Sequence, residues 1–304
     1  MTYRVDIAGV VMEHAILNAS GFVKTLEEVR LLARSLSAAV VLGSITLAQR
    51  EGNIGTTLWI SPNGLFSLNS LGLPNPGAEY YKLNLPEMVK VVHGAGKPLF
   101  VSVAGFNSRE FSALTELSFE GGADAVILNF GCPNVWDTGE QKRIVSFYPD
   151  LVYDALTKVG LVVGSEVKVI VKVSPISDPY LLVQIAQVIG EFELVKAVVA
   201  CNTFPNGFFL DGVNPVITFG KGFGGVAGVA MKPIVMGQVK QWREALPTRI
   251  QIVAAGGVNS AADVLDYLNP LVGAIAVKVG TGVHDQGIRI FDRLVTEYVG
   301  LVEL

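Results

Sequence analysis

Short apolar runs recur along the chain and alternate with segments of helical periodicity. Runs of this length, bounded by turn residues, are typical of strands buried on both faces of a parallel sheet. Eight of them occur, at residues 15–18, 39–42, 99–103, 125–128, 169–173, 197–200, 251–254 and 274–277. Strands alternating with helices over about 250 residues predict a (β/α)8 TIM barrel, and a doubly wound open α/β sheet is the alternative.

The starts of several helices carry recognisable signals. Residues 25–28 and 260–263 have the sequence of capping boxes that open the helices following them. Pro86 and Pro233 suit the first turns of two further helices. No linker rich in Pro, Gly and Ser divides the chain, so we expect a single domain over residues 1–304.

Composition narrows the class of protein. Half of the 304 residues are hydrophobic and only 16% are charged, which favours a heavily buried sheet. The net charge is −4 and Lys and Arg form no block, so no nucleic-acid partner is expected. No apolar run reaches the roughly 18 residues of a membrane span, and the first residues lack the apolar core of a signal peptide. With only two cysteines, we expect a reduced, cytoplasmic protein.

The segment that most suggests chemistry is residues 129–134, which read Asn-Phe-Gly-Cys-Pro-Asn and follow an apolar run. At a strand tip, Cys132 can act as a proton acceptor or nucleophile when its thiolate is accessible. Asn129 and Asn134 each offer donors and an acceptor for a flat heterocycle. The alternative is a β-turn in which the cysteine is a small buried hydrophobe.

Glycine-rich loops follow the last two predicted strands. Gly256 and Gly257 come after the seventh strand, and residues 280–282 (Gly-Thr-Gly) come after the eighth. Barrel enzymes bind phosphate at these two loops, because glycines let backbone N–H groups approach it closely. A phosphate site is therefore favoured over glycines that merely end strands. Residues 224–228 are expected to form a third, flexible loop without the context of a dinucleotide fingerprint.

A lysine lies among the apolar residues of one predicted strand. Lys172 belongs to the run 169–173, and a buried ammonium there needs either a ligand anion or a structural ion pair. No group of Cys, His, Asp and Glu has the spacing of a metal site, and the three histidines receive no role.

Other polar residues follow predicted strands or lie in turn-rich segments. Asn202 and Thr203 follow the sixth predicted strand, whereas Cys201 beside them is interpreted as core packing. Asn69 lies in a segment rich in turn residues, and on its own it would be a turn residue.

An ordered set of short motifs resembles one known family. In chain order these are residues 18–21 (Asn-Ala-Ser-Gly), 46–47 (Thr-Leu), 50–53 (Arg-Glu-Gly-Asn), 69–75 (Asn-Ser-Leu-Gly-Leu-Pro-Asn), 129–134, Asn202, 206–207 (Asn-Gly) and 224–228. The set resembles the class 1 dihydroorotate dehydrogenases, closest to class 1A, from about Leu17 to the last helix. Class 2 members carry an N-terminal membrane-associated extension and usually a serine where this chain has Cys132.

The resemblance implies FMN-dependent oxidation of dihydroorotate to orotate in pyrimidine biosynthesis, by a homodimer with fumarate as oxidant. Cys132 would be the general base, and Lys172 would stabilise negative charge on reduced flavin. The residues implied in cofactor binding are Ala19, Ser20, Asn129, Lys172, Gly228, Gly256, Gly257, Gly280 and Thr281. Those implied in substrate binding are Asn69, Leu71, Gly72, Leu73, Asn134, Asn202 and Thr203. Class 1B members instead need a partner subunit that carries an iron–sulfur cluster and FAD.

Three segments depart from the family pattern. Gly43 stands where the family has a lysine that reaches both flavin and substrate. Without Lys24 or Arg50 as a replacement, a substrate carboxylate would lose a charge-assisted hydrogen bond of about 1.5–3 kcal/mol. Residues 54–57 replace a Pro-Arg segment, and residues 135–139 carry Trp-Asp where the family usually has Pro and Gly.

Two alternatives therefore stay open. One is a flavin enzyme of the same mechanism acting on another cyclic substrate, such as a pyrimidine without the carboxylate. The other is a non-catalytic barrel that binds FMN or another phosphate ligand. If dihydroorotate is the substrate, we expect Gly43→Lys to change the affinity little or to crowd the site. If the substrate lacks a carboxylate, we expect Gly43→Lys to create or strengthen orotate binding, by up to roughly tenfold or more for about 1.4 kcal/mol.

Overall fold

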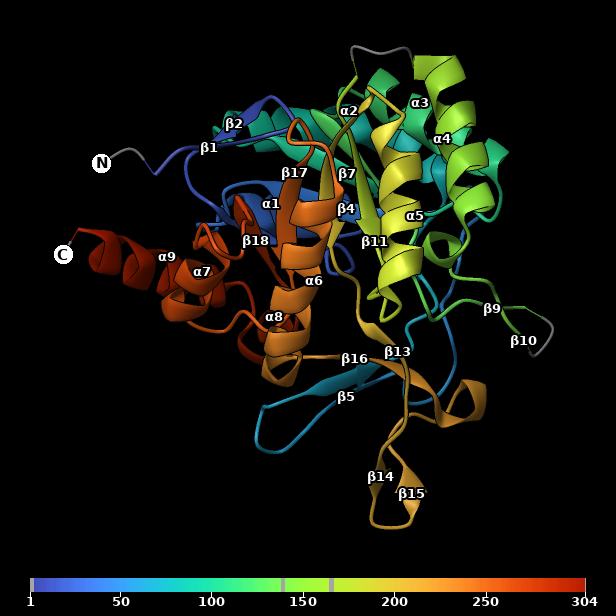
Figure 1. Ribbon diagram of the computed structural model, residues 1–304, viewed down its shortest axis with the longest axis vertical. Coiled ribbons are helices and arrows are strands. Elements are labelled where there is room, and N and C mark those ends of the chain that lie inside the picture. Colours follow the sequence, from blue (N-terminus) through green and yellow to red (C-terminus); the bar gives the residue numbers. More distant parts are fainter. Residues whose placement is uncertain (1–2, 138–139, 164–166, 304) are drawn as a thin grey trace.

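Eight parallel strands form the central sheet of the computed structural model, which describes residues 3–137, 140–163 and 167–303. The sheet curls into a nearly closed barrel with helices around it, so the predicted (β/α)8 architecture is confirmed (Figure 1). In hydrogen-bonded order the strands are β3 (Ile16–Asn18), β18 (Ala276–Val279), β17 (Gln251–Ala255), β12 (Val195–Ala200), β11 (Val169–Val173), β8 (Ala125–Asn129), β7 (Leu99–Val103) and β4 (Val40–Ile45). Each predicted apolar run overlaps one of them.

A side chain joins the two ends of this strand order, β3 and β4. Asn18, which is 1% exposed, donates from Nδ2 to the carbonyl oxygen of Val41 at 2.8 Å. Its Oδ1 accepts from the backbone N–H of Val41, also at 2.8 Å. The amide thus satisfies both backbone groups of Val41, which a neighbouring strand would otherwise satisfy.

The N-terminal part of the barrel interior is apolar and is covered at its end. Side chains such as Leu17, Phe100 and Ile127 form one interior cluster with residues of the hairpin β1 (Val5–Ile7) and β2 (Val10–Met12). A second, larger cluster joins the outer faces of the strands to the surrounding helices. Because the N-terminal end is covered, a ligand is expected at the carboxyl ends of the strands.

The helices around the barrel are α1 (Leu26–Ala33), α2 (Ala78–Gly94), α3 (Ser108–Glu120), α4 (Pro149–Val163), α5 (Pro179–Gly190), α6 (Lys232–Ala245), α7 (Ala261–Leu268), α8 (Thr281–Gln286) and α9 (Arg289–Val302). Shorter 3₁₀ helices span Val145–Phe147, Gly220–Gly222 and Val229–Met231. Both predicted capping boxes are confirmed, at Thr25 before α1 and at Ser260 before α7. Within the described part of the chain, no helix is long and apolar enough to cross a bilayer.

The two helix-start prolines behave differently. Pro233 lies in the first turn of α6, as predicted. The prediction for Pro86 is wrong, because α2 begins earlier, after Gly77, and Pro86 lies inside it. A proline there removes one backbone hydrogen bond of the helix, and the remaining turns and the buried face of α2 maintain it.

A small antiparallel sheet lies over the carboxyl ends of the barrel strands, at the opposite end from β1 and β2 (Figure 1). Its order is β13 (Phe204–Gly207), β16 (Gly224–Ala227), β6 (Ser67–Asn69) and β5 (Leu58–Ile60). Two hairpins extend from the same end, β9 (Trp136–Asp137) with β10 (Glu140–Gln141), and β14 (Leu210–Asp211) with β15 (Asn214–Pro215).

This sheet corrects two predictions. Residues 224–228 were expected to form a flexible loop, but β16 occupies most of them and pairs with both β6 and β13. Asn69 was assigned to a turn-rich loop, but it ends β6 and pairs with Leu58 and Gly225. Both segments become strands because distant insertions pair with them, which their local composition does not indicate.

Candidate active site

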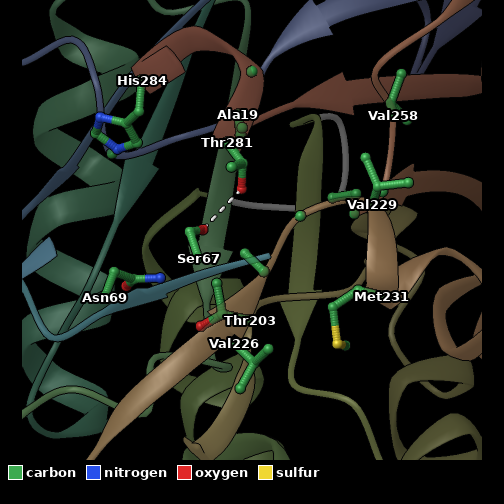
Figure 2. Close-up of a pocket in the computed structure, with 18 of the residues that line it drawn as sticks. Ala19, Ser67, Asn69, Thr203, Val226, Val229, Met231, Val258, Thr281 and His284 are labelled. Carbon is green, nitrogen blue, oxygen red and sulfur yellow. Dashed lines mark hydrogen bonds between the residues drawn. The ribbon is translucent and has the colours of Figure 1, made fainter. Parts of the chain in front are cut away.

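A cavity of about 530 Å³ lies between the barrel mouth and the small sheet. Many of the predicted binding residues line it: Ala19, Ser20, Asn69, Leu71, Lys172, Asn202, Thr203, Gly228, Gly256, Gly257, Gly280 and Thr281. Apolar side chains that the sequence analysis did not single out, among them Val226, Val229 and Met231, form part of its wall (Figure 2). The remaining predicted residues, Asn129, Cys132, Asn134, Gly72 and Leu73, are not part of this lining.

The glycines at one end of the cavity keep backbone close to backbone. Gly257 has φ +71°, and a Cβ atom there would lie 2.6–2.8 Å from atoms of Lys232. Gly228 has φ +100°, and a Cβ atom there would lie 2.7 Å from Cα of Phe66. Any larger residue at position 228 or 257 would displace the neighbouring backbone. This glycine-lined end of the cavity, the glycine cradle, therefore depends on the absence of side chains.

Two hydroxyl groups complete this glycine-lined end. The Oγ1 atom of Thr281 and the Oγ atom of Ser67 lie 3.1 Å apart and point toward each other (Figure 2). Ser67 comes from the small sheet and was not predicted, since nothing in its local sequence sets it apart. Backbone N–H groups and hydroxyls at this end are suitable donors for a phosphate.

Lys172 is buried at the other end of the cavity, and its Nζ donates to Oγ of Ser20 at 3.4 Å. Burial lowers the pKa of Lys172, and Cys132 opposes this fall. Within the described residues Lys172 has no acidic partner within ion-pair distance, so the structural ion pair is not supported.

Lys278 is a second buried lysine on the cavity wall, and the sequence analysis missed it. It is 3% exposed, and its Nζ has no hydrogen-bond partner among the described residues. On β18 it is in register with Leu17 and Ala255, and burial lowers its pKa well below the ordinary value. The only sequence signal was a charged residue within an apolar run, the same signal that identified Lys172.

A chain of hydrogen bonds crosses the strand tips at the barrel mouth. Asn129 Nδ2 donates to Oγ of Ser44 at 2.9 Å, and Ser44 is bonded in turn to Ser102 at 2.8 Å. Asn202 Nδ2 donates to Oδ1 of Asn129 at 3.2 Å, and its own Oδ1 accepts from the N–H of Thr203 at 2.8 Å. The chain fixes the orientation of two predicted amides, because each has assigned donors and acceptors.

A second pair of amides is fixed next to it. Asn134 Nδ2 donates to Oδ1 of Asn69 at 2.9 Å, and Asn69 Nδ2 donates to the carbonyl oxygen of Gly225 at 3.1 Å. The hydroxyl oxygen of Thr203 is buried without a partner among the described residues, so it is available to a ligand. Residues far apart in sequence are thus assembled at one place.

Cys132 lies just beyond the tip of β8 and is partly exposed. Burial of the sulfur raises the pKa of Cys132 above its ordinary value, although a backbone hydrogen bond from Asn134 lowers it. Lys172, Lys24 and Arg50 also lower this pKa through their charges. The thiol is therefore the form present at neutral pH, in a setting where three cations favour the thiolate.

The structure explains why position 43 has no side chain. Gly43 has φ +97°, and a Cβ atom there would lie 2.4 Å from the carbonyl oxygen of Ser102 and 2.7 Å from the nitrogen of Ile45. A lysine at position 43 would therefore crowd this backbone, and its effect on orotate binding stays a prediction. The new side chain would displace β4 or β7 before its ammonium could reach a ligand.

The other two divergent segments pack against the long insertion between β12 and α6. The N–H of Thr56 donates to Oγ1 of Thr218 at 2.8 Å, and the N–H of Thr218 donates back to Thr56 O at 3.1 Å. Trp136 packs on Phe219 with ring centroids 6.2 Å apart, and on Gly220, where a Cβ atom would lie 2.6 Å from the indole. Of the predicted loop 135–139, residues 138 and 139 lie outside the described residues.

The histidines are accounted for by local contacts. His93 Nε2 lies 2.8 Å from Oδ2 of Asp124, and His284 packs on Phe22 with centroids 4.4 Å apart. His14 is buried, and its Nδ1 accepts from the N–H of Ile16 at 3.2 Å. Across the described residues no group of three or more His, Cys, Asp or Glu is arranged to hold a metal ion.

The fold and the cavity define a (β/α)8-barrel protein with its ligand site at the carboxyl ends of the strands. Residues 2–300 match the model of the dihydroorotate dehydrogenase family, and the chain belongs to that family. It is 32% identical over 301 residues to dihydroorotate dehydrogenase (fumarate) of Trypanosoma brucei brucei, covering 97% of this chain and 91% of that protein. It is 31% identical over 285 residues to dihydroorotate dehydrogenase A (fumarate) of Lactococcus lactis subsp. cremoris, covering 92% and 88%.

Proposed function

We propose that this chain is an FMN-dependent oxidoreductase that converts dihydroorotate to orotate in pyrimidine biosynthesis, with fumarate as oxidant. The observation that carries the proposal is the composition of the barrel mouth. A glycine cradle lies at one end, while Cys132 and four fixed amides lie at the other. Family relatives named for dihydroorotate and fumarate supply the substrate and the oxidant.

The cavity has the dimensions and donors that FMN requires. Its volume of about 530 Å³ falls in the range of about 300–1,000 Å³ that is typical of cofactor sites. Gly228, Gly256, Gly257, Gly280 and Thr281 would hold the phosphate, and Ala19, Ser20, Asn129 and Lys172 would hold the ring system. The unpartnered ammonium of Lys278 supports an occupant that presents an acceptor or negative charge to it.

When bound, FMN would supply a two-electron acceptor for the hydride that leaves C6 of the substrate. Asn69, Asn134, Asn202 and Thr203, with the backbone of residues 71–73, would hold the pyrimidine ring. Cys132, which is partly exposed, would first release its proton to solvent, which the neighbouring cations make easier, and its thiolate would then take the proton from C5. Lys172 would balance the negative charge that the reaction delivers to this end of the cavity.

A flavin enzyme for a cyclic substrate without a carboxylate is the second candidate, and Gly43 is the observation that favours it. A non-catalytic barrel is less well supported, because a protein that only binds its ligand does not need a thiol whose pKa is lowered by three nearby cations. The proposal further includes a cytoplasmic homodimer without nucleic-acid or membrane partners. Its support is the class 1A resemblance.

The visible spectrum of the purified protein tests the proposal. We expect a yellow protein with about one FMN per chain, whose absorbance is bleached by dihydroorotate without oxygen and restored by fumarate. A yellow protein that dihydroorotate does not bleach would select the second candidate. A colourless protein that takes up no added FMN would contradict both flavin mechanisms.

A further inference from the structure

Lys24 is a cation close to Cys132 that lies on the wall of a second cavity. Lys24 lines a cavity of about 720 Å³ that adjoins the first one, with Gly21, Phe22 and Leu71 contributing to both. Among the described residues its Nζ makes no hydrogen bond or ion pair. The residue nevertheless lies close enough to Cys132 for its charge to lower the pKa of that thiol.

Backbone hydrogen bonds anchor the segment containing Lys24 to strand β4. The N–H of Gly43 donates to the carbonyl oxygen of Val23 at 2.8 Å, and its own carbonyl accepts from the N–H of Gly21 at 2.5 Å. A Cβ atom at position 43 would meet Ser102 and Ile45, so residues 21–24 do not occupy its space. Lys24 therefore directly follows a segment that is bonded to the position where the family pattern has a lysine.

The backbone of Lys24 is fixed, and its ammonium is not neutralised by the nearest acid. Its N–H donates to Oε2 of Glu28 at 2.7 Å, and its carbonyl accepts from the hydroxyl of Tyr81 at 2.9 Å. The same Oε2 also accepts from the N–H and hydroxyl of Thr25, at 2.9 and 3.1 Å. Glu28 is thus occupied by the helix cap, which leaves the ammonium free for a ligand.

The two other cations that act on Cys132, Arg50 and Lys172, are already engaged by the protein. Arg50 donates from Nε to the carbonyl oxygen of Gly72 at 2.9 Å and lies over the ring of Phe106, 4.9 Å from its centroid. Lys172 is bonded to Ser20 in the first cavity. Burial lowers the pKa of Lys24 to about 8, with Cys132 and Glu28 opposing the fall and Lys172 adding to it. An anion beside this ammonium would restore its charge and be strongly bound in return.

We propose that Lys24 binds the carboxylate of the substrate, which makes it the residue that selects an acidic pyrimidine over a neutral one. The inference rests on the proposed function, because it requires that dihydroorotate or orotate occupies the site. Lys24 would then supply the positive charge that Gly43 cannot.

Titration of orotate against the flavin absorbance tests the proposal. We expect Lys24→Met to weaken orotate binding at least tenfold, and to leave the weaker binding of uracil, which lacks the carboxylate, unchanged. Lys24→Arg should retain most of the orotate affinity, because it retains the charge. Lys82→Met is the matched control, since it removes an exposed lysine from α2 and should change neither affinity. Unaltered FMN content verifies that each variant is folded.

The pH dependence adds an independent measurement. In the parent, orotate affinity should fall as the pH rises through about 8, because Lys24 of the free protein then loses its proton. Lys24→Arg should bind orotate with no such fall. A pH profile identical in the two proteins would contradict the assignment.

The outcomes separate this inference from the function on which it rests. If the parent binds orotate and Lys24→Met binds it equally well, Lys24 is not the carboxylate ligand, and the proposed function stands. If the parent contains FMN but neither binds orotate nor is bleached by dihydroorotate, the proposed function fails and the inference fails with it.

Discussion

The two ends of the barrel mouth, the glycine-lined end of the cavity (the glycine end) and the end beside Cys132 (the thiol end), are built in different ways. At the glycine end, Gly228 and Gly257 have left-handed backbone conformations and neighbours within 3 Å of a hypothetical Cβ atom. At the thiol end, Asn69, Asn129 and Asn202 are oriented by one another across separate loops. The first end depends on side chains being absent and the second on side chains being paired. The two ends should therefore fail in different ways when mutated.

The largest effect should come from the thiol end. Cys132→Ala should keep its FMN but reduce the flavin about 10²–10⁴-fold more slowly with dihydroorotate, since that is the usual contribution of a general base. Cys132→Ser should retain part of the rate, with a larger share at high pH. Anaerobic stopped-flow bleaching measures both variants, and an unchanged rate in Cys132→Ala would leave the cysteine as a turn residue only.

The pH profile of the parent sharpens the same assignment. Burial raises the pKa of Cys132, so most of the protein carries a neutral thiol at neutral pH. The rate of flavin reduction at saturating substrate should therefore rise by up to about tenfold per pH unit until the thiol is deprotonated. A flat profile in the parent would indicate that proton transfer to Cys132 does not limit the reaction.

A glycine substitution should cause a loss of cofactor rather than a loss of rate. In Gly257→Ala the added Cβ would meet the backbone of Lys232 at a residue with φ +71°, a strain of about 1–3 kcal/mol. We expect the FMN content of the purified variant to fall about tenfold or more. Gly237→Ala in α6 is the control, because a Cβ atom there meets nothing within 4 Å. Full FMN occupancy in Gly257→Ala would mean that the cradle tolerates a methyl group.

Lys278 allows a finer test, because it belongs to neither end and its ammonium has no hydrogen-bond partner in the described part of the chain. Its pKa is lowered in the folded state, so the flavin-free protein should gain stability as the pH rises toward the ordinary lysine pKa of about 10.4. Lys278→Met should flatten that dependence and raise the melting temperature of the flavin-free protein by about 2 °C or more per kcal/mol. In the FMN-bound protein, Lys278→Met should weaken the binding of reduced flavin relative to oxidised flavin. Each tenfold loss of this preference should lower the flavin midpoint potential by about 30 mV. Thermal melts and redox titration measure these effects. No change in either measurement would show that Lys278 affects neither the stability of the protein nor the potential of the flavin.

The sequence predicted the glycine end better than the thiol end, for a physical reason. Gly256 and Gly257 follow a buried strand directly, so their position after a barrel strand was readable from local order alone. Asn69 was recognised only through its family motif, because the pairing that makes it part of a strand comes from β5 and β16, elsewhere in the chain. The lack of space at Gly43 could not be predicted, because it depends on Ser102 in a neighbouring strand. The position of Lys24 depends on backbone bonds from residues 21 and 23 to Gly43, which no local pattern encodes.

The amide of Asn18 has a consequence for how the barrel forms and opens. Because this side chain holds Val41 at both its N–H and its carbonyl oxygen, hydrogen exchange at the Val41 amide reports directly on whether β3 and β4 are joined. Beyond the junction lie Ala19 and Ser20, which follow β3, and Gly43 and Ser44, which belong to β4. Opening at this point would therefore separate the two sides of the barrel mouth before any strand ladder was broken.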